Sequence, residues 1–208
     1  HPIIVSSVVF GVIIASAFVT RTEVRHWRTS RLVVLVTTLG LTFALLGIRS
    51  GAYENPTPII LIVAGSIAIC AMILPGISGS FILLMIGLYD HLIGALDERD
   101  FSVLLLYMVG AIIGLALFSR VLHKLLSRYR DLIVSALLGL MLGSLRVLWP
   151  WPSNQGGLED TRLGAPIGED VVGALVAAML GAALVVVIVG LMSRYRDFDA
   201  EDALEMER

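Results

Sequence analysis

The sequence predicts an all-α, polytopic membrane protein, and its composition and long apolar runs are the evidence. Of the 208 residues, 57% are apolar and 15% are charged, and the mean hydropathy is +0.91. Soluble domains carry about a quarter charged residues, so a single water-soluble core would not bury this many apolar side chains. The composition excludes disordered, collagenous and disulfide-rich chains and argues against a soluble enzyme. Cys70 is the only cysteine, which also excludes an internal disulfide and a cysteine zinc cluster.

The apolar runs predict the membrane spans. A bilayer core of roughly 30 Å needs about 17 to 25 apolar residues in each helix. Five runs meet this requirement, at 2–20, 32–48, 101–118, 132–148 and 171–192. A sixth region, 59–89, is longer and is interrupted in its middle. We expect a single transmembrane domain over 1–197 and an acidic cytoplasmic tail over 198–208, with an external loop over 150–170.

The basic residues predict the orientation, because Lys and Arg in short loops mark the cytoplasmic side. Most of them fall at 21–31, 120–130 and 194–208, which places these segments and the C-terminus in the cytoplasm. The acidic cluster at 97–100 then lies outside. Region 59–90 must therefore enter and leave the membrane on the same outer face. We expect a re-entrant, broken hairpin whose tip lies inside the membrane or just short of the cytoplasmic face.

The tip of this hairpin is the candidate binding site. Irregular backbone in hydrocarbon leaves polar groups unpaired, and proteins tolerate this where those groups bind something. A helix that begins here presents N–H groups and the positive end of its dipole, which attract anions. The serines add hydroxyl donors and the glycines allow close approach. The tip residues are Pro75, Gly76, Ile77, Ser78, Gly79 and Ser80. The alternative interpretation is a kink that only packs against a neighbouring helix.

Three charged or titratable residues near the outer side complete the candidate set. Arg146 is a possible second ligand for an anion, or a snorkelling arginine at the interface. Asp90 and His91 lie at the outer mouth of the hairpin. They are either a protonatable pair that couples transport to a proton gradient, or an ordinary helix end at the headgroups.

Two further patterns describe packing and anchoring. The sequence Ser-Arg-Tyr-Arg-Asp occurs at 127–131 and again at 193–197, and we interpret both copies as interfacial anchors. The glycines at 110 and 114, and those at 139 and 143, are small-residue pairs that predict close helix packing.

The segments 71–81, 87–89, 127–131 and 139–151 resemble the polyprenyl-phosphate transporter family, long catalogued as domain of unknown function 368. The resemblance implies that undecaprenyl phosphate returns from the outer to the cytoplasmic leaflet of a prokaryotic inner membrane. Given this cargo, the hairpin tip supplies the donors for the phosphate, and Arg146 is either a second contact on the outer side or an interfacial arginine. Family members carry an earlier Pro-Gly-x-Ser-Gly hairpin in an inverted repeat. This chain has one copy and begins at His1, so we expect an N-terminally truncated protein with half of that repeat.

Two other functions remain as alternatives. An undecaprenyl-pyrophosphate-type phosphatase also uses broken hairpins and a serine motif, but it needs an arginine beside the serine, and 59–89 holds no charge. An ion or small-solute channel normally carries ionisable residues inside the membrane. A serine-hydrolase motif would need glycine at position 80. We expect no enzyme, cofactor, metal or nucleic-acid partner; the expected partners are a polyprenyl-phosphate lipid and the bilayer.

Overall fold

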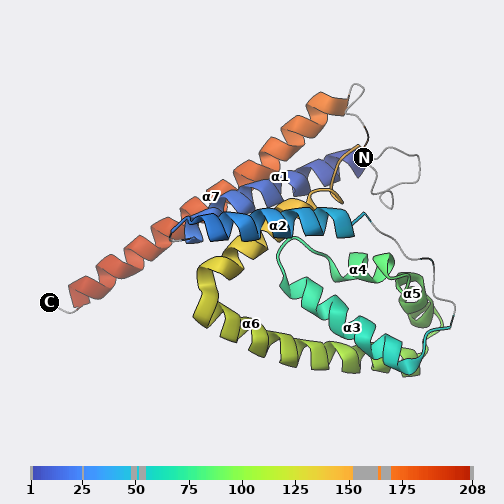
Figure 1. Cartoon of the computed structure of the whole chain (residues 1–208). Helices are drawn as coiled ribbons and strands as arrows, with labels where there is room; N and C mark the ends of the chain where they lie inside the picture. Colours follow the sequence, from blue (N-terminus) through green and yellow to red (C-terminus); the bar gives the residue numbers. More distant parts are fainter. Residues whose placement is uncertain are drawn as a thin grey trace. The chain divides into compact units, whose positions relative to one another are not determined.

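A computed structural model of the chain describes residues 2–24, 26–47, 51, 55–151, 164 and 170–206. Every regular element in these residues is helical, which confirms the all-α class (Figure 1). The elements are α1 (Pro2–Thr20), the 3-10 helix η1 (Arg21–Glu23), α2 (Thr29–Leu45), α3 (Pro58–Ile73), α4 (Gly79–Met85), α5 (Tyr89–Asp97), α6 (Phe101–Ser144) and α7 (Asp170–Met206). They form two units. The first contains α1 and α7, and the second runs from Thr20 to Val147.

In the first unit, α1 and α7 pack through small residues. A Cβ added to Gly11 would lie 1.9 Å from the Ala178 carbonyl oxygen, and one added to Gly181 would lie 2.2 Å from that of Val8. Such close approach is how helices associate where hydrophobicity cannot drive them together. The apolar part of α7, Val171–Ser193, agrees with the span expected at 171–192. The helix then continues to Met206, into the expected tail.

The first unit also contains the aromatic residues at the outer end of the expected spans. The rings of Trp149 and Trp151 meet edge to face with their centroids 5.6 Å apart. The indole N–H of Trp149 donates a hydrogen bond of 2.9 Å to the Gly164 carbonyl. Most of the expected external loop at 150–170 lies outside the described residues.

In the second unit, α6 has 44 residues and one break. At 1.5 Å per residue its length is roughly 66 Å, about twice a bilayer core. Tyr129 alone has non-helical dihedrals, φ −132° and ψ 40°. The ribbon turns back near this residue (Figure 1). The spans expected at 101–118 and 132–148 are therefore joined by helix instead of by an irregular loop. The connecting residues contain neither glycine nor proline, so helix propensity persists through them.

The two halves of α6 each pack against a shorter helix. Beside α3, Gly110 faces Ile62 and Gly114 faces Ser66, so these two helices run in the same direction. The Ser66 hydroxyl donates a 2.6 Å hydrogen bond to the Gly110 carbonyl. Beside α2, Gly139 faces Leu35, and Gly143 faces Leu39 and Thr42. The small-residue pairs of the sequence thus lie at helix–helix contacts.

The hairpin is present, and its second arm is itself broken. The chain leaves α3, turns at 74–78 and returns as α4, which has seven residues. A second break follows at Gly87, where φ is +74°, and α5 continues at 110° to α4. The residues that hold α3, α4 and α6 together form one buried cluster: Leu61, Ala64, Leu83, Leu88 and Tyr107.

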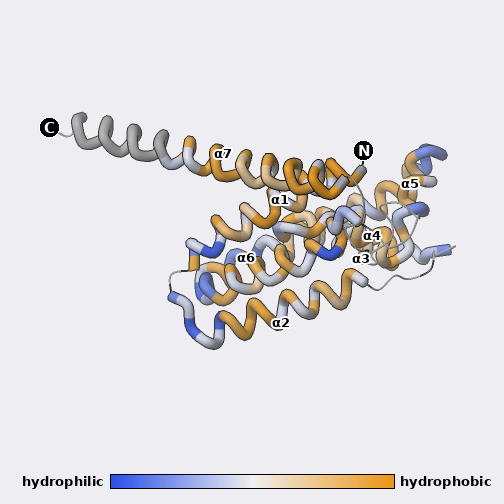
Figure 2. The backbone as a smooth tube through the Cα atoms, turned by 90° about the horizontal axis from the view of Figure 1, so that it is seen from above, coloured by the Kyte–Doolittle hydropathy of each residue, from blue (hydrophilic) through white to orange (hydrophobic). Residues whose placement is uncertain are grey.

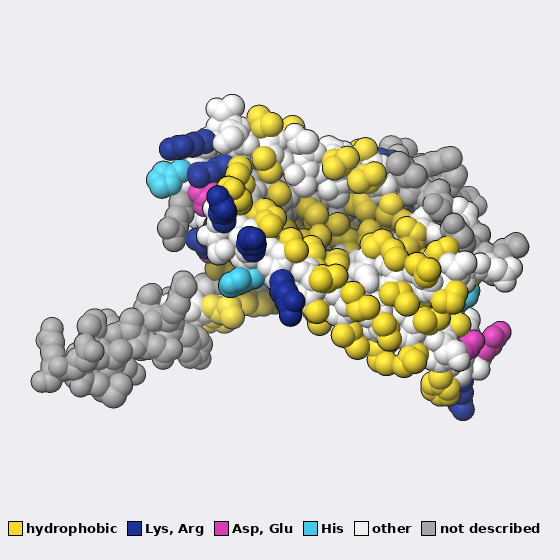
Figure 3. Space-filling model, turned by 60° about the horizontal axis from the view of Figure 1, so that its bottom comes forward, with side chains coloured by type: hydrophobic (Ala, Val, Ile, Leu, Met, Phe, Trp, Pro, Cys, Tyr) yellow, Lys and Arg dark blue, Asp and Glu magenta, His cyan; other side chains and the backbone are white. Residues whose placement is uncertain are grey.

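Charged and apolar residues of the second unit are segregated. On the face drawn in Figure 3, Lys and Arg side chains gather at one end and hydrophobic side chains cover the middle. A small acidic group lies at the other end, where α5 ends and α6 begins. Figure 2 shows the same pattern along the backbone, with hydrophilic residues where α2 begins and around α5. Three helical stretches are long and apolar enough to cross a membrane: Ile3–Glu23, Phe101–Ser144 and Val171–Ser193.

Candidate functional site

The turn of the hairpin packs against the second half of α6. Gly76 has φ +89°, a conformation that L side chains rarely adopt. A Cβ added there would lie 2.9 Å from the Ser144 Oγ and 3.0 Å from the Met141 Cα. Met141 lies about 12 residues, or roughly 18 Å, along the helix from the break at Tyr129. The turn is therefore well removed from the basic end of this unit.

Two hydroxyl groups are exposed at this turn. The Oγ atoms of Ser78 and Ser80 lie 2.7 Å apart and share a hydrogen bond. Ser78 is the N-cap residue of α4, but its side chain makes no capping hydrogen bond. The first N–H groups of α4 have no intrahelical acceptor, as at the start of any helix. Together the turn presents hydroxyl and amide donors within a few residues.

The other residues of the turn differ in how far they are buried. Gly79 is buried against α3, because a Cβ there would lie 2.6 Å from the Ala68 carbonyl oxygen. Pro75 is exposed and Ile77 is half-buried. With seven residues, α4 has only a small dipole. Any affinity for an anion at the turn therefore depends on individual N–H and O–H donors.

Arg146 lies just beyond α6 and is held by α2. Its Nη1 donates a 2.9 Å hydrogen bond to the Phe43 carbonyl, and the guanidinium carbon lies 4.7 Å from the centroid of the Phe43 ring. Gly47 leaves room for it, since a Cβ there would lie 2.6 Å from the guanidinium. Ser144, which touches the turn, is two residues away. The structure therefore brings the turn to the end of α6, while the Arg146 guanidinium contacts α2.

Asp90 and His91 begin α5 but have different surroundings. Asp90 is exposed, whereas His91 is half-buried with its ring centroid 6.4 Å from that of Tyr107. Its Nδ1 atom is buried and has no hydrogen-bond partner within the described part of the chain. The Tyr107 hydroxyl donates to the Leu88 carbonyl at 3.3 Å. The described contacts therefore place these two neighbours in separate environments.

Sequence reasoning missed two contributions to this region. Ser144, which is 3% exposed, lies against the turn, although no sequence pattern marks this serine. The residues at 127–131, interpreted as an interfacial anchor, also line a hollow that the sequence does not predict. Among the described residues, no group of three His, Cys, Asp or Glu side chains is arranged to hold a metal ion.

The fold and the broken hairpin define a polytopic helical membrane protein. The chain belongs to the family described as undecaprenyl phosphate translocase-like, whose model matches residues 1–165. This confirms the resemblance recognised in the sequence motifs.

Two curated relatives share this similarity, and both are named polyprenyl-phosphate transporter. The chain is 44% identical to the protein from Vibrio cholerae over 73% of this chain and 49% of the relative. It is 32% identical to the protein from Staphylococcus aureus over 42% of this chain and 33% of the relative. The chain thus spans about half the length of the first relative and a third of the second. No solved structure matches it.

Proposed function

We propose that the protein carries a polyprenyl phosphate, such as undecaprenyl phosphate, between the leaflets of a prokaryotic inner membrane. The phosphate binds at the hairpin turn, residues 75–80. The observation that carries this proposal is the exposed pair Ser78 and Ser80, whose hydroxyls lie 2.7 Å apart at the start of α4, where the first N–H groups have no intrahelical acceptor. The names of the family and of both relatives support the same cargo.

The depth of the turn suits this cargo. A phosphate that crosses hydrocarbon unaided loses its water at great cost, so a carrier must replace that water with donors of its own. The turn lies at the end of a 16-residue helix, roughly 24 Å from the start of α3. The prenyl tail would stay in the lipid, beside the many exposed apolar side chains of α3 and α6.

The direction proposed is from the outer to the cytoplasmic leaflet. The segregation of Lys and Arg to one end of the second unit supports a cytoplasmic position for that end, and the basic residues at 194–208 support the same side for the C-terminus. Arg146 is the proposed second contact for the headgroup, on the outer side. Asp90 and His91 are the proposed residues that couple transport to a proton gradient.

Transport is favoured over phosphatase chemistry. The hairpin, 59–89, contains no Asp, Glu, Lys or Arg, so it supplies no guanidinium of its own beside the serines to hold a diphosphate. A serine without such a neighbour, or a nearby base, has little to activate it.

The test follows undecaprenyl phosphate between leaflets in proteoliposomes that contain the full-length protein. The variant Ser78→Ala/Ser80→Ala removes both hydroxyls, and we expect transport to fall by about tenfold or more, as for lost hydrogen bonds to a charged group. Ser119→Ala is the control, because Ser119 is exposed on α6 and its hydroxyl contacts only the Ala116 carbonyl among the described residues. Unchanged transport in the double variant would refute the turn as the site. Release of phosphate from undecaprenyl diphosphate would instead establish an enzyme.

A further inference from the structure

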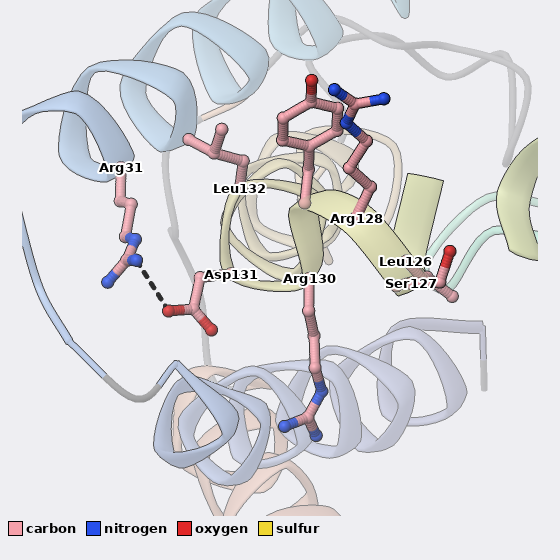
Figure 4. A pocket seen from close by; sticks show the side chains of 8 residues that line it. Arg31, Leu126, Ser127, Arg128, Arg130, Asp131 and Leu132 are labelled. Atoms are coloured by element: carbon pink, nitrogen blue, oxygen red, sulfur yellow. Dashed lines mark ion pairs between the residues drawn. The ribbon is translucent and has the colours of Figure 1, made fainter. Parts of the chain in front are cut away.

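A hollow of about 580 Å³ lies at the break in α6 (Figure 4). It is lined by Arg31 of α2 and by residues 126–132 of α6. Three arginines and a single aspartate are among these residues, so the lining is net positive. The volume is in the range of small-molecule sites, which is about 300–1,000 Å³. The hollow is separate from the hairpin turn described above.

Arg31 has unused hydrogen-bonding capacity in this hollow. Its Nη2 forms an ion pair of 2.8 Å with Asp131 Oδ2, drawn as the dashed line in Figure 4. Its Nη1 is buried and has no hydrogen-bond partner in the described part of the chain. A buried N–H without an acceptor is costly, and native structures usually supply an acceptor for it. An anion in the hollow would supply one.

Arg128 and Arg130 differ in how they are engaged. Arg130 forms an ion pair with Glu23, and Figure 4 shows it pointing away from Arg128. The Arg128 guanidinium lies 5.6 Å from the centroid of the Tyr129 ring and has no ion pair among the described residues. Arg128 is therefore a second cation with capacity for an anion; Figure 4 shows its guanidinium directed away from Arg31, so this exposed side chain must turn to share a phosphate with Arg31. Guanidinium groups bind phosphate oxygens in a forked geometry, which suits this role.

The apolar part of the lining distinguishes a lipid from a free ion. Leu126 and Leu132 are half-buried in the wall, and Tyr129 is 49% exposed. The hollow also lies next to the basic residues at 120–130, where the apolar stretch that begins at Leu132 follows them. Tyrosine and arginine at such a boundary are typical of the headgroup level of a bilayer.

We infer that this hollow is a second headgroup site, which binds the phosphate of a lipid through Arg31 and Arg128. The inference rests on the proposed function, because it gives the carried headgroup a place at the basic end after it leaves the turn. Asp131 competes with the phosphate for Arg31.

The test measures equilibrium binding of farnesyl phosphate and of inorganic phosphate to the full-length protein in neutral-lipid nanodiscs. All variants carry Ser78→Ala/Ser80→Ala, so that the turn does not contribute. Arg31→Gln and Arg128→Gln are expected to weaken farnesyl phosphate binding about tenfold, as for the loss of a charge-assisted hydrogen bond. Asp131→Asn is expected to strengthen it. Arg120→Gln, an exposed charge on α6 outside the hollow, is the control and is expected to bind like the parent.

The expected changes in affinity have opposite signs, a loss for the two arginine variants and a gain for Asp131→Asn. Misfolding cannot produce this pattern, since a misfolded variant loses binding and does not gain it. Equal binding by all four variants would overturn the inference. Inorganic phosphate that binds as tightly as farnesyl phosphate would overturn the assignment to a lipid. Leaflet-to-leaflet transport is measured in parallel for the wild type and for Arg31→Gln and Arg128→Gln with both serines of the turn intact. Binding that depends on Arg31 and Arg128 without any wild-type transport refutes the proposed function alone. If wild-type transport is present and neither transport nor binding depends on Arg31 and Arg128, the second site alone is refuted.

Discussion

Arg146 caps the C-terminal end of α2 by donating from Nη1 to the carbonyl oxygen of Phe43, at 2.9 Å. Phe43 is in the last turn of α2, where carbonyl groups have no intrahelical partner. The same guanidinium lies over the Phe43 ring at 4.7 Å. A cation at this position also interacts favourably with the negative end of the helix dipole. Arg146 therefore has a structural role besides the headgroup contact proposed for it.

We expect Arg146→Ala to lower the free energy of unfolding by about 1–2 kcal/mol, from the lost hydrogen bond and cation–π contact. Denaturation in mixed micelles measures this change. Arg120→Ala, which removes an exposed charge from α6, is the control. A variant of normal stability that no longer transports lipid would instead show that Arg146 acts as a headgroup ligand alone.

Gly76→Ala tests the conformation of the turn. The residue has φ +89°, and the added Cβ would lie 2.9 Å from the Ser144 Oγ. We expect a destabilisation of about 1–3 kcal/mol from backbone strain and crowding, together with loss of transport. Gly94→Ala is a matched control, because it lies in α5 with no atom within 4 Å of the added Cβ. There the same change should be neutral or stabilise the helix by up to about 1 kcal/mol. Equal effects of the two variants would contradict this account of the turn.

The sequence was sufficient to predict the helical class, the interrupted hairpin and the glycine contacts, because each depends on local composition. Apolar runs predict helices at 2–20 and 171–192, and Pro75 with Gly76 predicts the turn. The pairs at 110 and 114 mark where α3 approaches α6. These features follow from chain length, apolar content and the special conformations of glycine and proline.

Features that depend on tertiary contacts were not predictable. The break at Tyr129 occurs in a stretch without glycine or proline, so no local signal marks it. The hollow needs Arg31 from α2 as well as the segment 126–132, and sequence alone does not bring them together. The contact of Gly76 with Ser144 joins residues that are far apart in the chain. The short α4 was partly foreseeable, because Gly87 allows the positive φ that ends it.

Gly110→Ala tests the packing of α3 against α6. A Cβ at this position would lie 2.0 Å from the Ile62 carbonyl oxygen, which is backbone and has little freedom to move. We expect the unfolding free energy to fall by about 1–3 kcal/mol because the helices must separate. The control is Gly40→Ala on α2, where nothing lies within 4 Å of the added Cβ. A Gly110 variant as stable as the control would contradict this close helix contact.

Cysteine labelling tests the proposed orientation. In a Cys70→Ala background the chain has no other cysteine, so Glu98→Cys and Arg120→Cys can be labelled singly. With a membrane-impermeant maleimide, intact cells should label position 98 and not position 120, and inside-out vesicles should show the reverse. This follows from the basic end facing the cytoplasm. Labelling of both positions from the same side would refute the orientation.

The two ion pairs found among the described residues of the second unit should differ in strength because they differ in exposure. The side chains of Arg31 and Asp131 are 18% and 15% exposed, whereas those of Arg130 and Glu23 are 45% and 56% exposed. Water and salt screen the exposed pair, so we expect a coupling energy below about 1 kcal/mol for it. For the less exposed pair we expect roughly 2 kcal/mol, since removal of one partner leaves the other poorly solvated. Double-mutant cycles with alanine, measured at low and high salt, give both values. A larger coupling energy for the exposed pair, Arg130 with Glu23, would contradict this ranking by exposure.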